Sequence, residues 1–177
     1  MRIMILPGHS HWDNGAVNAE FKRTEYSVVS AVAQKLFEKE DFDQHDVIFK
    51  NRNKSYAALP VEINSWGPEL IMELHLNAAS DPKVQGTEVL IAKGSVKGRT
   101  YGEIVLNELL NEFGFKNRGI KEVARDDRGA NLLYKTKAPC MIVEAYFLSG
   151  ITNEQNNEKF LVDKYVRAIY NALKKFK

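Results

Sequence analysis

Residues 70–74, Leu-Ile-Met-Glu-Leu, form a nearly continuous apolar run that ends at His75. Two other runs have the same form: Ile3-Met4-Ile5-Leu6 leads into Pro7-Gly8-His9, and Met141-Ile142-Val143 leads into Glu144. Runs of this kind are typical of strands buried on both faces of a parallel sheet, and open α/β sheets carry their chemistry at the carboxyl ends of such strands. We therefore expect His9, His75 and Glu144 at one edge of a sheet.

The segments between these runs predict an α/β fold with a twisted, mainly parallel sheet and helices on both faces. Further strands are expected at 46–49 and 86–92. Helices are expected at 26–37, around 56–66 and at 101–113, with Gly114 as a C-cap. A last helix should carry the apolar positions from 160 to 173, and Thr152 with Gln155 is a candidate capping box for it.

Composition narrows the function classes. The 177 residues are 44% apolar and 27% charged, which suits one domain spanning 1–177, and no repeat or linker marks a second module. The formal charge of +2, without a basic run, argues against nucleic-acid binding. Four apolar residues before Pro7 are too few for a signal peptide, and no run is long enough to cross a bilayer. We expect a soluble protein made in the cytoplasm, with its one cysteine, Cys140, buried in a strand.

His9 and His75 follow similar strands, so a shared metal site is plausible, whereas His11 and His45 lack that context and are expected at the surface. A third ligand should be an oxygen donor, because Cys140 lies within a strand. The carboxylates that follow His9 are Asp13, Glu20 and Glu25. Glu25 begins the first helix, where it could instead match the helix dipole, so the residues alone leave Glu20 and Glu25 open.

Glu144 ends an apolar strand, where a carboxylate is costly to bury unless it has a use. Beside a two-histidine, one-carboxylate zinc site it could accept the proton of an attacking water. Glu73 shares a strand face with His75, as an outer partner of that histidine or as a salt-bridge residue. An Fe(II) oxygenase also uses two histidines and a carboxylate, but its usual jelly roll does not fit the βα alternation. No H-E-x-x-H, G-x-G-x-x-G, G-x-S-x-G or phosphate-loop motif is present.

The ordered set of motifs resembles the zinc-dependent N-acetylmuramoyl-L-alanine amidases of the Amidase_3 family. The matching pieces are 6–9 with Gly15-Ala16, Glu25, 74–78, 86–89, 117–119, Pro139, 142–144 and 147–149. The resemblance implies zinc ligands His9, Glu25 and His75, so it favours Glu25 over Glu20, with Glu144 as catalytic base. It also implies hydrolysis of the amide between the lactyl group of N-acetylmuramic acid and L-alanine in peptidoglycan. Asn77, Asn117 and Arg118 become candidate substrate contacts; a structural loop is the favoured role for most of 122–129.

Within the family, the chain is similar to catalytic domains of phage and prophage endolysins of clostridial-type hosts, through 71–78 and Lys54-Ser55-Tyr56. Ser10-His11 and 62–64 depart from many relatives. The resemblance covers the whole chain, which implies no separate wall-binding domain. We expect a monomer that reaches the wall through a holin-type pore or after mother-cell lysis. Alternatives are a sporulation or wall-remodelling amidase, a zinc peptidase acting on the stem peptide, and a non-catalytic wall-binding protein.

Overall fold

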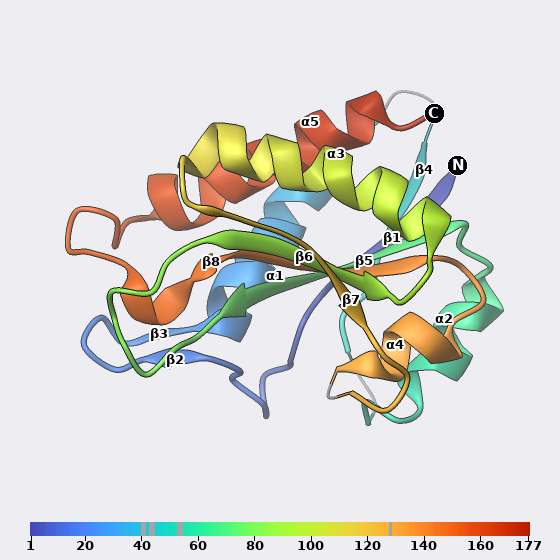
Figure 1. Ribbon diagram of the computed structural model, residues 1–177, viewed down its shortest axis with the longest axis horizontal. Coiled ribbons are helices and arrows are strands. Elements are labelled where there is room, and N and C mark those ends of the chain that lie inside the picture. Colours follow the sequence, from blue (N-terminus) through green and yellow to red (C-terminus); the bar gives the residue numbers. More distant parts are fainter. Residues whose placement is uncertain (40–41, 43–44, 53–54, 128) are drawn as a thin grey trace.

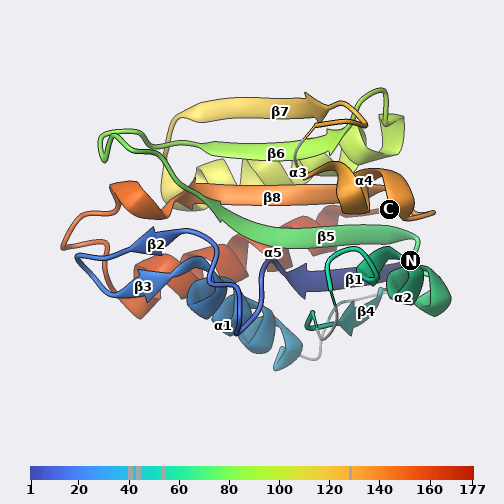
Figure 2. The same cartoon turned by 90° about the horizontal axis from the view of Figure 1, so that it is seen from below.

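The computed structural model describes residues 1–39, 42, 45–52, 55–127 and 129–177. Its centre is a six-stranded sheet in the order β4-β1-β5-β8-β6-β7. Figure 2 looks onto one face of this sheet. These strands are β1 (Arg2–Pro7), β4 (Asp46–Phe49), β5 (Leu70–Asn77), β6 (Thr87–Ala92), β7 (Asn117–Val123) and β8 (Cys140–Phe147). Strands β4, β1, β5 and β8 are parallel, whereas β6 runs antiparallel to β8 and parallel to β7. The expected mainly parallel sheet is confirmed.

The two faces of the sheet are covered unequally (Figure 1). The long helices α1 (Glu25–Phe37), α3 (Val96–Phe113) and α5 (Lys164–Lys175) pack on one face. The short helices α2 (Leu59–Trp66) and α4 (Ala130–Lys135) cover part of the other. A small hairpin of β2 (Val17–Asn18) and β3 (Arg23–Thr24) precedes α1. None of the helices among the described residues is long and apolar enough to cross a membrane.

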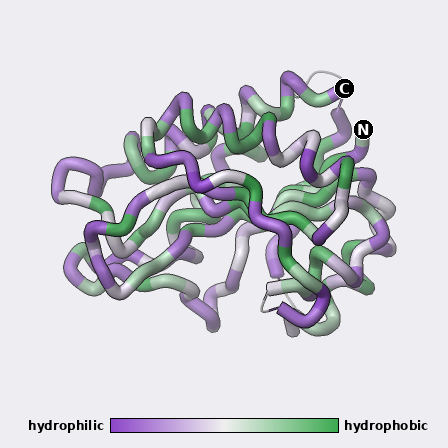
Figure 3. The backbone as a smooth tube through the Cα atoms, viewed as in Figure 1, coloured by the Kyte–Doolittle hydropathy of each residue, from purple (hydrophilic) through white to green (hydrophobic). Residues whose placement is uncertain are grey.

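Alternation along the strands decides which side chains reach the thinly covered face. In β5, Leu70, Met72 and Leu74 enter the core under the long helices, while Ile71 packs toward α2 and α4. Because successive side chains point to opposite faces, Glu73, His75 and Asn77 follow Ile71 on the second face. Strands β1, β5 and β8 are mostly apolar, and the centre of the molecule is largely green in Figure 3, so these polar residues interrupt an apolar part of the sheet. The sheet thus presents chemistry on the face that the short helices leave open.

Several boundaries differ from the sequence-based expectations. Helix α3 begins at Val96, earlier than expected, because Ser95 caps it by accepting from Gly98 N. Strand β7 and helix α4 were not expected as elements. Thr152 and Gln155 exchange the hydrogen bonds of a capping box, but these close a turn. The last helical segment begins later, with a single π turn at Lys159–Asp163 that continues into α5, and Asn157 Oδ1 accepts from Phe160 N near its start.

Candidate active site and metal centre

Strand register places the predicted residues side by side. His75 of β5 pairs with Glu144 of β8, and Glu144 pairs on its other side with Glu88 of β6. Gly8 donates to the carbonyl of Leu74, so the chain leaving β1 passes beside His75. Neighbouring strands lie about 4.8 Å apart, so these residues form a row across the sheet. A cavity of about 980 Å³ lies over this row, with His9, Asp13, Glu25, Arg52, Tyr56 and Glu73 also among its lining residues.

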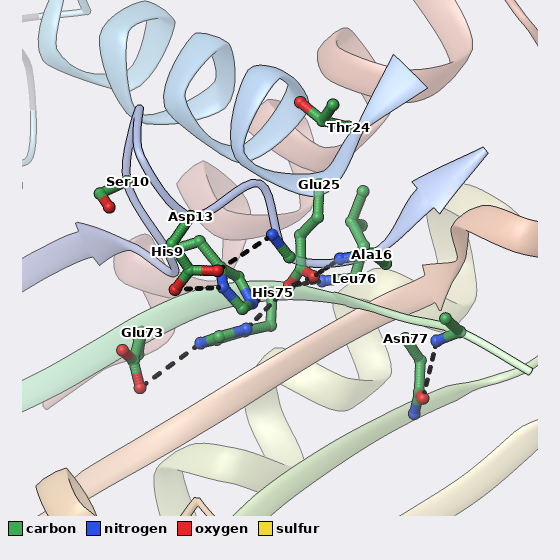
Figure 4. A network of polar contacts seen from close by, with 12 residues as sticks. His9, Ser10, Asp13, Ala16, Thr24, Glu25, Glu73, His75, Leu76 and Asn77 are labelled. Atoms are coloured by element: carbon green, nitrogen blue, oxygen red, sulfur yellow. Dashed lines mark hydrogen bonds and ion pairs between the residues drawn. The ribbon is translucent and has the colours of Figure 1, made fainter. Parts of the chain in front are cut away.

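Glu25 is brought to this row by the start of α1. Thr24 caps the helix by accepting from Ser27 N, and Ser27 Oγ accepts in turn from Thr24 N. The Glu25 side chain is 4% exposed, and its oxygens accept hydrogen bonds from Ala16 N at 2.8 Å and Leu76 N at 2.9 Å. Figure 4 shows the carboxylate between the two histidines. Its Oε1 lies 2.8 Å from His75 Nδ1 and its Oε2 lies 3.2 Å from His9 Nε2. Glu20, in contrast, is exposed.

Two glycines allow this close approach. A Cβ on Gly8 would lie 2.3 Å from the His75 ring, and one on Gly15 would lie 2.4 Å from Glu25 Oε2. Gly15 also has a φ of +66°, a conformation that favours glycine. His9 itself adopts a φ of +64°, which is uncommon for a residue with a side chain. The Pro7-Gly8-His9 and Gly15-Ala16 segments are thus shaped around the two rings and the carboxylate.

The donor set fits a zinc ion. One ligand atom from each of His9, Glu25 and His75 lies within 4.8 Å of the others. Two imidazoles and one carboxylate are a known zinc ligand set that leaves a position open for water or substrate. Each histidine also has a carboxylate near its other nitrogen: Asp13 Oδ2 is 3.1 Å from His9 Nδ1, and Glu73 Oε2 is 3.5 Å from His75 Nε2 (Figure 4). Such outer carboxylates orient histidine ligands.

The pKa values of these groups show how much negative charge the site holds. Burial opposes protonation of His75, but the charge of Glu73 and the hydrogen bond with Glu25 outweigh it and raise its pKa well above the usual value. For His9, burial is likewise outweighed by Glu25, and the pKa is raised. Burial would raise the pKa of Glu25, yet its hydrogen bonds with His75 and His9 lower it strongly. A cation in this site would replace the protons on the histidines.

Glu144 has the opposite environment. Its Oε2 is buried, and the described residues offer it no hydrogen bond. Burial is the main cause that raises the pKa of Glu144 from 4.5 to about 7; the charge of His75 lowers it, and nearby carboxylates raise it further. A carboxyl group with a pKa near neutrality can both accept and return a proton at neutral pH, which is what a general base in hydrolysis must do.

This burial should destabilise the metal-free protein at high pH. The pKa of Glu144 is higher in the folded state than in the unfolded state. Below about pH 4.5 the side chain is neutral in both states, and the free energy of unfolding falls as pH rises toward 7, where burial opposes its ionisation. Glu144→Gln should therefore raise the unfolding free energy by about 1–3 kcal/mol at pH 8, and not at pH 4. Thermal unfolding of both metal-free proteins at the two pH values measures this. An equal effect at both pH values would contradict it.

The remaining predicted residues have mixed outcomes. Asn77 lines the cavity and donates to Glu88 Oε1 at 2.8 Å. Arg118 is engaged with Glu88 Oε2 at 2.8 Å and is absent from the cavity lining. Asn117 is exposed, its Oδ1 accepts from Gly119 N, and it does not line the cavity. Cys140 is buried, as predicted, and His11 is exposed whereas His45 is partly buried. Lys54 and Arg128 lie outside the described residues.

Two charged residues of the cavity wall, Glu88 and Arg52, were not predicted from the sequence. Glu88 enters the row through the amino end of β6, because that strand is antiparallel to β8, while the sequence-based search considered the carboxyl ends of strands. Arg52 comes from the segment after β4, and its side chain is only 10% exposed. Glu88 directly follows the apparent strand start at 86–87, so an acid at that position was the available signal. Nothing in the sequence around Arg52 marked it.

The α/β domain thus carries a His-Glu-His donor set with a buried carboxylate beside it. This combination is typical of metal-dependent hydrolases. Residues 3–175 match the Amidase_3 family, described as N-acetylmuramoyl-L-alanine amidase, and the chain belongs to this family. It is therefore a hydrolase of the amidase type, and the family activity makes peptidoglycan its substrate. No curated protein matches the sequence.

Solved structures of amidase domains have the same fold. The catalytic domain of CwlV, an N-acetylmuramoyl-L-alanine amidase from Bacillus (Paenibacillus) polymyxa, is 17% identical, with a TM-score of 0.80 over 98% of this chain and 96% of that one. An N-acetylmuramoyl-L-alanine amidase from Clostridium difficile 630 is 21% identical, with a TM-score of 0.80 over 99% and 98%. The catalytic domain of CD27L, an endolysin targeting Clostridia difficile, is 26% identical, with a TM-score of 0.74 over 98% and 96%.

Proposed function

We propose that this amidase is zinc-dependent, with His9, Glu25 and His75 as ligands and Glu144 as general base. The observation that carries the proposal is a buried carboxylate, Glu144, whose Oε2 has no hydrogen-bond partner among the described residues and which is in register with one member of a converging His-Glu-His set. His9 would bind through Nε2 and His75 through Nδ1, since these nitrogens face Glu25. The catalytic unit is the single domain of residues 1–177. We also propose a monomer as the active form; every proposed ligand and the base come from one chain, so the site needs no second copy to be complete.

The reaction is hydrolysis of the amide between the lactyl carbonyl of N-acetylmuramic acid and the nitrogen of L-alanine. Zinc bound at the three ligands would supply Lewis-acid polarisation at the scissile carbonyl. Glu144 takes a proton from the attacking water on its carboxylate and later delivers it to the leaving nitrogen of L-alanine. The balance is one water consumed, one carboxyl group formed on the lactyl side, and one free amine formed on the peptide.

The rest of the cavity wall suits a large polar substrate. The acids and Arg52 offer polar contacts, and the Tyr56 ring, Leu90 and Ile142 offer apolar contact area in the same cavity. Among the predicted substrate contacts, Asn77 lines the cavity, so it keeps this role in the proposal. Arg118 and Asn117 are left out of the proposal because, unlike Asn77, they do not line the cavity.

We further propose an endolysin-like role, lysis of clostridial-type walls after synthesis in the cytoplasm and release. The 26% identity with the CD27L catalytic domain over 98% of this chain supports this role. A sporulation or wall-remodelling amidase would use the same chemistry. The CwlD amidase of Clostridioides difficile, solved in complex with the GerS lipoprotein, is 22% identical, with a TM-score of 0.74 over 97% of this chain and 94% of that chain.

Mass spectrometry of purified peptidoglycan tests the chemistry. The protein would be stripped with a chelator and assayed before and after zinc is restored. We expect intact glycan and free peptides beginning with L-alanine, produced only with zinc. Cleavage inside the stem peptide would identify a peptidase instead, and activity unaffected by chelation would exclude the zinc site. Binding without cleavage would indicate a wall-binding protein. Lysis of intact Gram-positive cells from outside then tests the endolysin role.

A further inference from the structure

Arg52 is a nearly buried cation in the wall of the catalytic cavity. Its side chain is 10% exposed, and its guanidinium lies 5.7 Å from the centre of the Tyr56 ring. Nη2 donates to Asp13 Oδ2 at 2.6 Å and to Ser10 Oγ at 3.0 Å. Both acceptors belong to the loop that follows His9, 39 and 42 residues away in sequence. Burying a guanidinium is costly unless it is paired, so Arg52 needs these acceptors. The contact thereby joins two segments, distant in sequence, beside the candidate metal centre.

The loop that Arg52 contacts is closed on itself. Ser10 and Asp13 form an antiparallel bridge, with Ser10 N donating to Asp13 O at 3.1 Å and Asp13 N donating to Ser10 O at 2.9 Å. His11 and Trp12 form its exposed tip, whereas Ser10 is 1% exposed. Arg52 therefore contacts the base of the loop, where the backbone leaves His9.

Asp13 links this contact to the ring of His9. The Oδ2 atom that accepts from Arg52 is also 3.1 Å from His9 Nδ1, without the alignment of a regular hydrogen bond. The opposite nitrogen of the ring, Nε2, faces Glu25 Oε2. A carboxylate at Nδ1 favours the tautomer in which Nδ1 carries the proton and Nε2 is free to bind a metal. The Asp13 side chain is 44% exposed, so without a partner it could turn toward water.

We propose that Arg52 is a positioning residue for the metal centre: it fixes Asp13, and Asp13 fixes the orientation and tautomer of His9. This inference rests on the proposed role of His9 as a zinc ligand. Arg52 touches none of the three ligands through any hydrogen bond or ion pair recorded for the described residues, so its effect should pass through Asp13.

The test is the zinc dissociation constant, measured by competition with a chromophoric chelator. Removing the partner of a ligating histidine typically weakens metal binding about 10–100-fold, which is the result expected for Asp13→Ala. Arg52→Gln should weaken binding about 10-fold, and the double variant should bind as weakly as Asp13→Ala alone, because Arg52 acts through Asp13. Asp13→Asn keeps an oxygen acceptor for Nδ1 and should lose less than Asp13→Ala. Arg99→Gln, which removes an exposed pair with Glu122, is the matched control and should change nothing.

His9→Ala distinguishes a wrong ligand set from a wrong role for Arg52. If His9→Ala binds zinc as well as the wild type, the proposed ligand set is wrong. If His9→Ala weakens binding but Arg52→Gln behaves like Arg99→Gln, the ligand set stands and the positioning role is overturned. Additive losses in the double variant would also overturn it. Nitrogen-15 NMR of the zinc-loaded protein supplies a second readout, since His9 should be the Nδ1–H tautomer in the wild type and lose that preference in Asp13→Ala. If Arg52→Gln does not fold, Arg52→Met, which has a long side chain but neither charge nor donor, carries the same comparison.

Discussion

Glu144→Ala should lower kcat for peptidoglycan hydrolysis by about 10²–10⁴-fold, the usual contribution of a general base. Zinc binding should stay within about threefold of the wild type, since Glu144 is not among the converging ligand atoms. The reason is local: the carboxyl group is in register with His75, its Oε2 has no donor among the described residues, and burial raises its pKa to about 7. Release of L-alanine-terminated peptides, measured by mass spectrometry, gives the rate.

The pH profile supplies a second check on the same residue. A base must be ionised to accept a proton, so kcat should fall as pH is lowered through the pKa of Glu144. That pKa is about 7 without metal, and a bound cation would lower it, because positive charge favours the carboxylate. The acidic limb should therefore lie at or below pH 7 and disappear in Glu144→Gln. Glu103→Gln, on an exposed position of α3, serves as the control. An unchanged rate in Glu144→Ala would exclude it as the base.

Gly8→Ala should abolish the metal site with a single methyl group. A Cβ at this position would meet three atoms of the His75 ring at 2.3, 2.4 and 2.7 Å, far inside van der Waals contact. Gly8 has no positive φ, so alanine suits its backbone and the ring is the obstacle. The ring cannot retreat freely, because Glu25 holds its Nδ1 at 2.8 Å. We expect zinc affinity to fall at least about 100-fold, as for loss of a ligand's correct orientation, and hydrolysis to fall with it.

The control for this variant is Gly102→Ala in α3. The atoms nearest to its added Cβ would be methyl groups of Ile120, Val89 and Ile91, at 3.3–3.7 Å, so a shift of a few tenths of an ångström should accommodate it. Zinc affinity by chelator competition and unfolding temperature should be measured for both variants. Loss of zinc with the fold retained in Gly8→Ala is the expected result. Wild-type zinc affinity in Gly8→Ala would mean that His75 is not held against this glycine.

The functional residues at the strand ends were predictable because the neighbouring sequence alone marks each of them. An apolar run that stops at a histidine or a glutamate needs no partner to be recognised, and parallel strands bring such ends to one edge. His9, His75 and Glu144 were found in this way, and the structure brings all three into one cavity. The positions of Glu20 and Glu25 relative to the histidines were not predictable locally, because both glutamates precede or open the first helix. The fold places the Glu25 side chain between the histidines, since the Thr24 cap starts α1 there, and leaves Glu20 exposed.

The sequence by itself determined the α/β class, the strands that carry the site and the histidines and glutamate at their ends, since hydrophobic periodicity reports burial along a chain. Tertiary structure alone decided which other residues join them. Glu88 arrives because β6 runs antiparallel to β8, and Arg52 arrives because the segment after β4 packs against the loop after β1. Strand direction and contacts between distant segments depend on the free energy of packing the whole sheet, which no single stretch of sequence contains.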